Sequence, residues 1–194
     1  MVDDSVATML TVERTRVLHP PMRALQYWKT VAMDEADFLG SLVKLLQKHR
    51  VRFCVIGGQG VNAYVDPLVS LDLDLVVAAE DMSRLEPLLS ESFRVERFPH
   101  SLNLSQPGSE LRAQIQTDPR YAAFVEGAAE RDVLGLRLPV ARLEDILSGK
   151  IWAVEDSTRR ASKRQKDLAD VARILEFRPE LRARVPQAVL ARLV

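Results

Sequence analysis

The fold is decided by the stretch FCVIGGQGVNAYVDPLVSLDLDLVV, residues 53–77. An apolar run ends on Gly57 and Gly58, and a short helical pattern follows them. A second apolar run then carries Asp72 and Asp74, two residues apart. The backbone N–H groups at the start of a helix are suited to binding phosphate. The stretch therefore indicates a phosphate site close to a pair of carboxylates.

The spacing of the two aspartates places them on one face of the second strand. Side chains two residues apart in a strand point the same way, so Asp72 and Asp74 share a face. The opposite face carries Leu71, Leu73 and Leu75, which we expect in the core. Two carboxylates this close repel each other unless a cation lies between them. Since magnesium prefers oxygen ligands and takes substrate phosphates into its shell, the pair predicts Mg²⁺ bound with a nucleoside triphosphate.

The rest of the chain predicts an α+β domain whose last third is helical. We expect residues 1–33 to form an N-terminal extension and residues 34–194 to form the domain, with its helical part from about residue 142. Strands are expected at residues 51–56, 70–77, 93–98, 102–104 and 111–117, with a hairpin or bent strand at 132–138. Helices are expected at residues 34–50, 59–64, 81–90, 121–126, 142–154 and 161–177, with short ones around Pro179 and Pro186.

The composition narrows the class of protein. Hydrophobic residues make up 47% of the 194, which is enough for a core, and no apolar run is long enough to span a membrane. The 27 basic and 27 acidic residues balance, so net charge predicts no nucleic-acid partner, and we expect no DNA specificity. Cys54 is the sole cysteine, and the first residues are acidic where a signal peptide is basic. These features favour the cytoplasm.

The motifs GGQGVNAY and LDLDLVV together resemble the signature of the polymerase-β-like nucleotidyltransferases. Within that superfamily the chain looks most like the small bacterial group that contains minimal nucleotidyltransferases and AbiEii-type toxins. The later segments PVARLEDILSGKIWA and SKRQKDLADVARILE are similar to the helical segments of that group, and the resemblance covers about residues 36–177. It implies a nucleotidyltransferase fold, a mixed β-sheet flanked by helices, with a C-terminal helical extension.

The resemblance implies roles for the residues of the opening stretch. Gly57 and Gly58 would hold the triphosphate, with Gln59 beside them in the nucleotide-binding set. Asp72 and Asp74 would be catalytic residues that bind the metal. In this family a third carboxylate, on a later strand, supports a second metal and acts as general base for the acceptor hydroxyl.

The strand that should carry the third acid is LRAQIQT, residues 111–117. Gln114 stands where the acid is expected, and an amide cannot take a proton at neutral pH. Glu110 and Asp118 lie at the two ends with the same parity, and we prefer Asp118 because it directly follows the strand. Three interpretations stay open: one of these acids substitutes, the base is dispensable, or the protein binds nucleotide without transferring it.

The helix expected at residues 161–177 begins with a run of charges. Lys163 and Asp167 have i, i+4 spacing, as do Lys166 and Asp170, which by itself favours a solvated face with weak ion pairs. The resemblance instead places a Lys–Asp pair in a helix that lines the active cleft. It implies that Lys166 contacts the triphosphate and that Asp167 orients this lysine.

Other basic residues are candidates for phosphate contacts. Lys150, in the segment LSGKIWA, is a second candidate for the triphosphate. An RNA acceptor would be steered by phosphate contacts with Arg159, Arg160, Lys163 and Arg164.

We expect a Mg²⁺-dependent nucleotidyltransferase that moves a nucleoside monophosphate from a nucleoside triphosphate to an RNA (tRNA) or protein acceptor. The resemblance also suggests the toxin of a toxin–antitoxin pair, with a cognate antitoxin as partner. Two alternatives remain: a small-molecule enzyme that acts on an antibiotic, and a catalytically silent module that binds a nucleotide or a partner. A purely structural protein would leave Asp72 and Asp74 without a reason.

Overall fold

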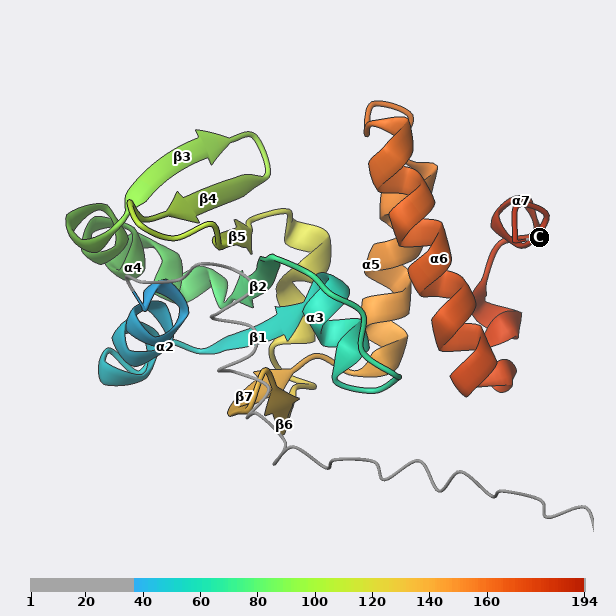
Figure 1. The fold of residues 1–194 in the computed structure, drawn as a ribbon, viewed down its shortest axis with the longest axis horizontal. Coiled ribbons are helices and arrows are strands. Elements are labelled where there is room, and N and C mark those ends of the chain that lie inside the picture. Colours follow the sequence, from blue (N-terminus) through green and yellow to red (C-terminus); the bar gives the residue numbers. More distant parts are fainter. Residues whose placement is uncertain (1–36, 194) are drawn as a thin grey trace, which may run out of the picture.

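The computed structural model describes residues 37–193, so the extension expected at residues 1–33 lies outside the described part. The strands are β1 (Phe53–Ile56), β2 (Asp72–Val77), β3 (Arg94–Phe98), β4 (Ser101–Ser105), β5 (Arg112–Gln116), β6 (Ala129–Val133) and β7 (Leu136–Val140). They form one seven-stranded sheet in the order β3-β4-β5-β2-β1-β7-β6 (Figure 1). The sheet is mixed, as expected.

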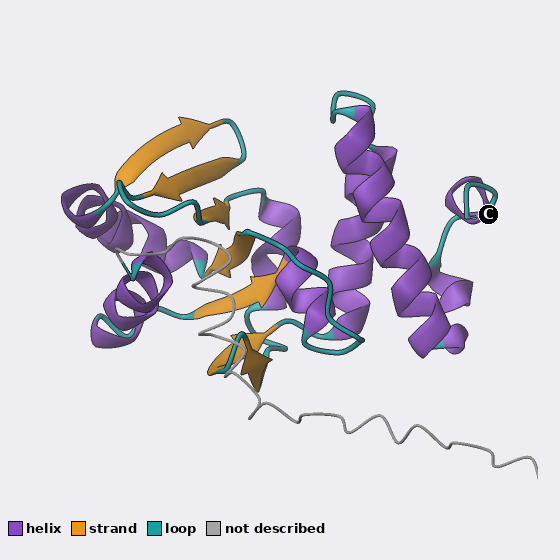
Figure 2. Cartoon of the chain, viewed as in Figure 1, coloured by secondary structure: helices purple, strands orange, loops and turns teal. Residues whose placement is uncertain are grey.

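The helices flank the sheet, and the last third of the chain is helical (Figure 2). They are α2 (Phe38–Lys48), α3 (Gly57–Asn62), α4 (Ala79–Ser92), α5 (Leu143–Glu155), α6 (Ala161–Phe177) and α7 (Gln187–Leu190), with 3₁₀-helices η1 (Pro119–Phe124) and η2 (Pro179–Arg184). Figure 1 shows α2 and α4 at the opposite end of the view from α5 and α6. Within residues 37–193, no helix is long and apolar enough to cross a membrane.

The centre of the sheet brings the opening stretch against a later strand. β1 and β2 are antiparallel neighbours, joined through α3. β2 also pairs in parallel with β5, and β1 pairs in parallel with β7. Because β2 and β5 run the same way, the polar residues at the start of one lie beside those of the other.

Alternation along β2 and β5 sorts their side chains between the core and the opposite face. Leu73 and Leu75 are buried, which confirms their predicted place in the core, and Ala113 and Ile115 of β5 are buried as well. The prediction for Leu71 is wrong, since this side chain is 39% exposed. β2 begins only at residue 72, so Leu71 belongs to the preceding loop and is not held to the alternation of the strand.

The hairpin predicted around Gly135 is confirmed. β6 and β7 are antiparallel, and the two residues between them, Leu134 and Gly135, have φ of 57° and 81°. A two-residue turn with positive φ at both positions matches the twist of a β-hairpin. β7 in turn leads into α5, which carries side chains to the site described below.

Candidate active site

Asp72 and Asp74 lie at the start of β2 on the face opposite the core, and both are half-buried. The register of the parallel pair places Gln114 beside Asp74 and Arg112 beside Asp72. Gln114 thus occupies the position where the sequence predicts the third acid. Its amide oxygen accepts hydrogen bonds but does not take a proton at neutral pH.

Gly57 is required for the position of Asp74. It begins α3 with φ of 63°, a backbone conformation that residues other than glycine rarely adopt. A Cβ at this position would also overlap the carboxylate of Asp74. Gly58 is under less constraint, because a Cβ there would lie 3.4 Å from the Ser70 Oγ, an ordinary contact. The first glycine of the pair therefore makes room for the carboxylate next to it.

Two adjoining cavities meet at Asp74. One measures about 90 Å³ and the other about 260 Å³, compared with roughly 300–1,000 Å³ for typical small-ligand sites. The residues that line both are Asp74, Gln114, Lys150, Arg159 and Asp167. The structure therefore brings together most of the side chains that the sequence proposes for the site.

The smaller cavity, here called the aromatic cavity, is lined by Tyr121 and Phe124 in addition to the shared residues. Tyr121 also packs edge-on against Trp152, with ring centroids 5.2 Å apart. Gly149 leaves space for the tyrosine, since a Cβ there would lie 3.0 Å from the Tyr121 Cε1. No sequence motif indicates this wall, because its residues come from η1 and α5, which are separate segments of the chain.

The larger cavity, here called the basic cavity, gathers five cationic side chains: Arg112, Lys150, Arg159, Lys163 and Lys166. It also includes Gly58, Asp72 and Asp74, so the glycine pair and both carboxylates border it or its neighbour. Arg112 was not among the predicted residues. The alternation of β5 held the signal for it, since Arg112 has the same parity as Gln114.

The electrostatics of Asp74 favour a nearby cation. Burial raises the pKa of Asp74 above its ordinary value, Lys150 opposes this rise, and the charge of Asp72 adds to it. Keeping the Asp74 carboxylate ionised therefore costs free energy, and an additional bound cation would reduce that cost.

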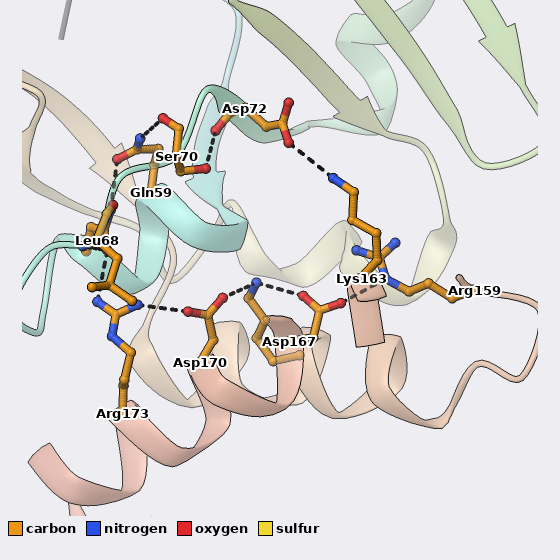
Figure 3. A network of polar contacts seen from close by, with 11 residues as sticks. Gln59, Leu68, Ser70, Asp72, Arg159, Lys163, Asp167, Asp170 and Arg173 are labelled. Atoms are coloured by element: carbon orange, nitrogen blue, oxygen red, sulfur yellow. Dashed lines mark hydrogen bonds and ion pairs between the residues drawn. The ribbon is translucent and has the colours of Figure 1, made fainter. Parts of the chain in front are cut away.

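Asp72 has a cationic neighbour from a distant part of the chain. The Nζ of Lys163, on α6, lies 3.4 Å from the Asp72 Oδ2, and the two side chains are about equally exposed (Figure 3). This pair joins α6 to β2 across the basic cavity. Lys163 therefore belongs to the site, although the sequence suggested for it an i, i+4 pair with Asp167 or the steering of an acceptor.

A chain of alternating charges links side chains of α5, α6 and the loop between them (Figure 3), and three of its members line both cavities. Arg159 donates through Nε to the Asp167 Oδ2 at 2.8 Å, and Lys150 donates to the Asp167 Oδ1 at 2.9 Å. Lys150 also lies 2.6 Å from the Asp170 Oδ2, and Arg173 donates to the Asp170 Oδ1 at 2.8 Å. Lys150, Asp167 and Asp170 are at most 7% exposed. The chain ties α5 to α6.

These contacts correct the expected pairs along α6. Asp167 and Asp170 pair with Lys150 of α5, not with Lys163 and Lys166 at i, i+4 spacing. The carboxylates face α5 and are buried, whereas Lys166 is exposed and borders the basic cavity. Burial lowers the pKa of Lys150, but Asp170 and Asp167 outweigh it and hold the pKa above its ordinary value. Lys150 therefore stays charged, with its ammonium shared by two carboxylates.

The two acids weighed as substitutes for the third carboxylate lie elsewhere. Asp118 caps η1 by accepting a hydrogen bond from the Arg120 backbone N–H at 2.9 Å, and it pairs with the Arg120 guanidinium. The hydrogen bond from that guanidinium holds the pKa of Asp118 below its usual range. Glu110 is exposed and borders a separate hollow beside β3 and β4. The structure does not bring either acid into the two cavities.

Gln59 is buried and makes its hydrogen bonds within the protein. Its Nε2 donates to the Ser70 carbonyl at 2.9 Å, and its Oε1 accepts from Asn62 at 3.3 Å. It is 2% exposed and lines neither cavity. Gln59 thus fixes the loop that leads into β2 (Figure 3), which sets the position of Asp72 indirectly.

The donor set fits one divalent ion better than two. Within the described residues no group of three or more His, Cys, Asp or Glu gathers into a possible metal site. Asp72 and Asp74 supply two carboxylates on one face, and Gln114 is the neighbour of Asp74 in the register and lines both cavities. Mg²⁺ commonly takes one or two protein carboxylates and completes its shell with water and substrate phosphates. The residues present suit that arrangement.

No protein-family model and no curated protein matches the sequence. Solved structures do match it. The antibiotic-resistance factor ANT(2'')-Ia is 13% identical with a TM-score of 0.54, over 82% of this chain and 97% of that one. The lincosamide antibiotic adenylyltransferase LnuA is 15% identical with a TM-score of 0.50, over 74% and 99%. A nucleotidyltransferase-like protein from Paracoccidioides brasiliensis is 20% identical with a TM-score of 0.50, over 86% and 87%.

At these identities the similarity concerns the fold. The chain has the fold of the polymerase-β-like nucleotidyltransferases, a mixed sheet flanked by helices, as the sequence predicted. The closer likeness to AbiEii-type toxins stays a prediction.

Proposed function

We propose that the protein is a Mg²⁺-dependent nucleotidyltransferase that transfers a nucleoside monophosphate from a nucleoside triphosphate to an acceptor hydroxyl. One observation carries the proposal: Asp72 and Asp74 share a face of β2 at the junction of the two cavities, beside Gly57 and the basic side chains. A solvated charged face would not need a glycine whose Cβ position is taken by a carboxylate.

Each part of the site has a role in this proposal. Asp72 and Asp74 would hold Mg²⁺, which when bound neutralises charge on the phosphates. The backbone at Gly57 and Gly58 accommodates the triphosphate, and Lys166, free of the buried charge chain, contacts it. Lys150 and Asp167 act as a fixed charged pair in the wall of both cavities, since they are already paired with each other and with neighbouring charges.

The reaction follows from these positions. The acceptor hydroxyl oxygen forms a bond to the α-phosphorus while the bond from that phosphorus to the bridging oxygen breaks, and pyrophosphate leaves. Gln114 orients the hydroxyl through its amide oxygen but does not take the proton, which passes to water. Asp118 is not given a role in this step, because it caps η1 and pairs with Arg120.

The acceptor we propose is an RNA, with a protein as the second choice. The basic cavity and the exposed Arg160 at the start of α6 support a polyanionic acceptor. A toxin role with a cognate antitoxin, and a place in the cytoplasm, rest on the sequence alone. An antibiotic acceptor is the alternative suggested by the fold shared with ANT(2'')-Ia and LnuA.

A silent binding module is the second candidate function. It is favoured by Gln114 at the expected acid position and by the Lys163 pair that already neutralises Asp72. The two functions differ in one respect, since both bind nucleotide and only the enzyme transfers it.

Transfer of label from an α-³²P nucleoside triphosphate tests the proposal. The protein is incubated with Mg²⁺ and, separately, with total RNA, a protein extract or aminoglycoside and lincosamide antibiotics. We expect label on RNA, and loss of that labelling in Asp72→Asn and Asp74→Asn, because each removes a charge that would hold the metal. Glu91→Gln, an exposed change at the far end of α4, serves as the control and retains labelling. Labelling that persists in both Asn variants contradicts the proposed mechanism, and nucleotide binding without label on any acceptor supports the silent module.

A further inference from the structure

Arg159 occupies a distinctive place in the site. It lies in the short loop between α5 and α6, and among residues 37–193 it is the only arginine that lines both the aromatic and the basic cavity. Arg159 therefore forms part of the wall of both cavities, as Asp74 does.

The loop that carries Arg159 is held by local hydrogen bonds. Asp156 accepts from the backbone N–H and from the hydroxyl of Thr158, at 2.9 Å and 2.6 Å. The backbone N–H of Arg159 then donates to the Asp156 carbonyl at 3.2 Å. This tight turn fixes the backbone from which the arginine side chain starts.

The guanidinium is oriented by only one of its donors. Nε donates to the Asp167 Oδ2 at 2.8 Å, and within the described residues the structure records no hydrogen bond from the two terminal nitrogens. Asp167 cannot swing away with the arginine, because its other oxygen accepts from Lys150 and the residue is 3% exposed. The terminal edge of the guanidinium is left for a ligand, in the fork geometry that suits a phosphate.

The other cations of the buried chain are paired more fully with the protein than Arg159 is. Lys150 is shared between two carboxylates, and Arg173 donates to Asp170, to the Asn62 side chain at 3.0 Å and to the Asp66 carbonyl at 2.5 Å. The positive charge available to a ligand therefore lies at the Arg159 end of the chain.

We propose that Arg159 is the residue that binds the nucleotide's phosphates at the junction of the two cavities, held in place by the Asp167–Lys150 pair. This assigns Arg159 to the nucleotide and not to the steering of an RNA acceptor, and it rests on the proposed function. Lys163 and Lys166 contact phosphates from within the basic cavity, whereas Arg159 reaches them from the wall next to Asp74.

Calorimetric titration with inorganic tripolyphosphate, with and without Mg²⁺, tests this role without any transfer step. Arg159→Gln should weaken binding by about tenfold or more, since it removes the charge-assisted hydrogen bonds that the guanidinium would make to phosphate. Arg159→Lys keeps the charge and loses the fork, so its affinity should fall between those of Arg159→Gln and the unmodified protein. Arg182→Gln is the matched control, because Arg182 is an exposed arginine of η2 that lines neither cavity, and the affinity of this variant should stay within about twofold of the unmodified protein.

Three results separate the inference from the function on which it rests. Equal affinity of Arg159→Gln and the unmodified protein overturns the role of Arg159 and leaves the nucleotide site standing. Equal losses in Arg159→Gln and Arg182→Gln also overturn it, because they indicate diffuse electrostatic attraction. Failure of the unmodified protein to bind tripolyphosphate, with or without Mg²⁺, rejects both the inference and the proposed function. Thermal unfolding of each variant checks that the fold is retained, and Arg159→Lys provides the comparison if Arg159→Gln unfolds.

Discussion

At the scale of single residues, the glycine pair has two separate physical explanations. Gly57 has a positive φ and lies against the Asp74 carboxylate, so the fold requires a residue without a side chain at this position. Gly58 has room for a Cβ next to Ser70, so nothing in the surrounding protein excludes a larger residue. Its value would lie in letting a ligand approach the backbone.

Alanine substitutions should separate these explanations. Gly57→Ala should lower the free energy of unfolding by at least about 1–2 kcal/mol, from the left-handed conformation alone, and should displace Asp74. Gly58→Ala should leave the free energy of unfolding unchanged or raise it by about 0.4–1 kcal/mol, because it restricts the unfolded chain. Urea unfolding measures both. Equal destabilisation by the two substitutions would show that the difference between the glycines is not as described.

At the scale of elements, α5 and α6 are joined by a buried charge in addition to apolar packing. Lys150 of α5 lies between Asp167 and Asp170, one turn apart on α6. A buried ion pair by itself adds little to the free energy of unfolding. Removal of one partner nevertheless destabilises the protein, because the other charge stays buried and is no longer compensated. The pairing also determines which helix faces meet, and so where Arg159 and Lys163 reach the cavities.

Lys150→Met should therefore destabilise the protein by about 3 kcal/mol, near the lower end for a broken buried pair, because each carboxylate keeps one arginine. Lys44→Met is the control, since Lys44 is 78% exposed and lies 3.9 Å from Asp37, and it should change the free energy of unfolding by no more than about 0.5 kcal/mol.

The pKa of Lys150 is raised in the folded protein above 10.5. The charged Lys150 therefore contributes fully to the free energy of unfolding below its pKa in the unfolded chain, and this contribution is lost as the pH rises through its pKa in the folded protein. The difference in free energy of unfolding between the unmodified protein and Lys150→Met should therefore narrow at strongly alkaline pH. Equal effects of the two substitutions at neutral pH would contradict this.

At the scale of the whole molecule, the fold and the centre of the site follow from local patterns, and the rest follows from contacts between distant segments. The period of two along the strands predicted that Asp72 and Asp74 share a face, and the family resemblance indicated Gln114 for the third position. The register places Gln114 beside Asp74. Helical spacing alone gave the wrong partners for Asp167 and Asp170. Their partner is Lys150 on another helix, and Lys163 reaches Asp72 across 91 positions of sequence. No local period records such contacts.

The central claim is that this junction of cavities binds a nucleoside triphosphate together with Mg²⁺. Calorimetric titration of the protein with a nonhydrolysable ATP analogue, in the presence and absence of Mg²⁺, tests it most directly. We expect binding that requires Mg²⁺ and that weakens by at least about tenfold, or 1.4 kcal/mol, when Asp72 and Asp74 are both replaced by Asn. Affinity that is the same without Mg²⁺, or unchanged in the double variant, would contradict it.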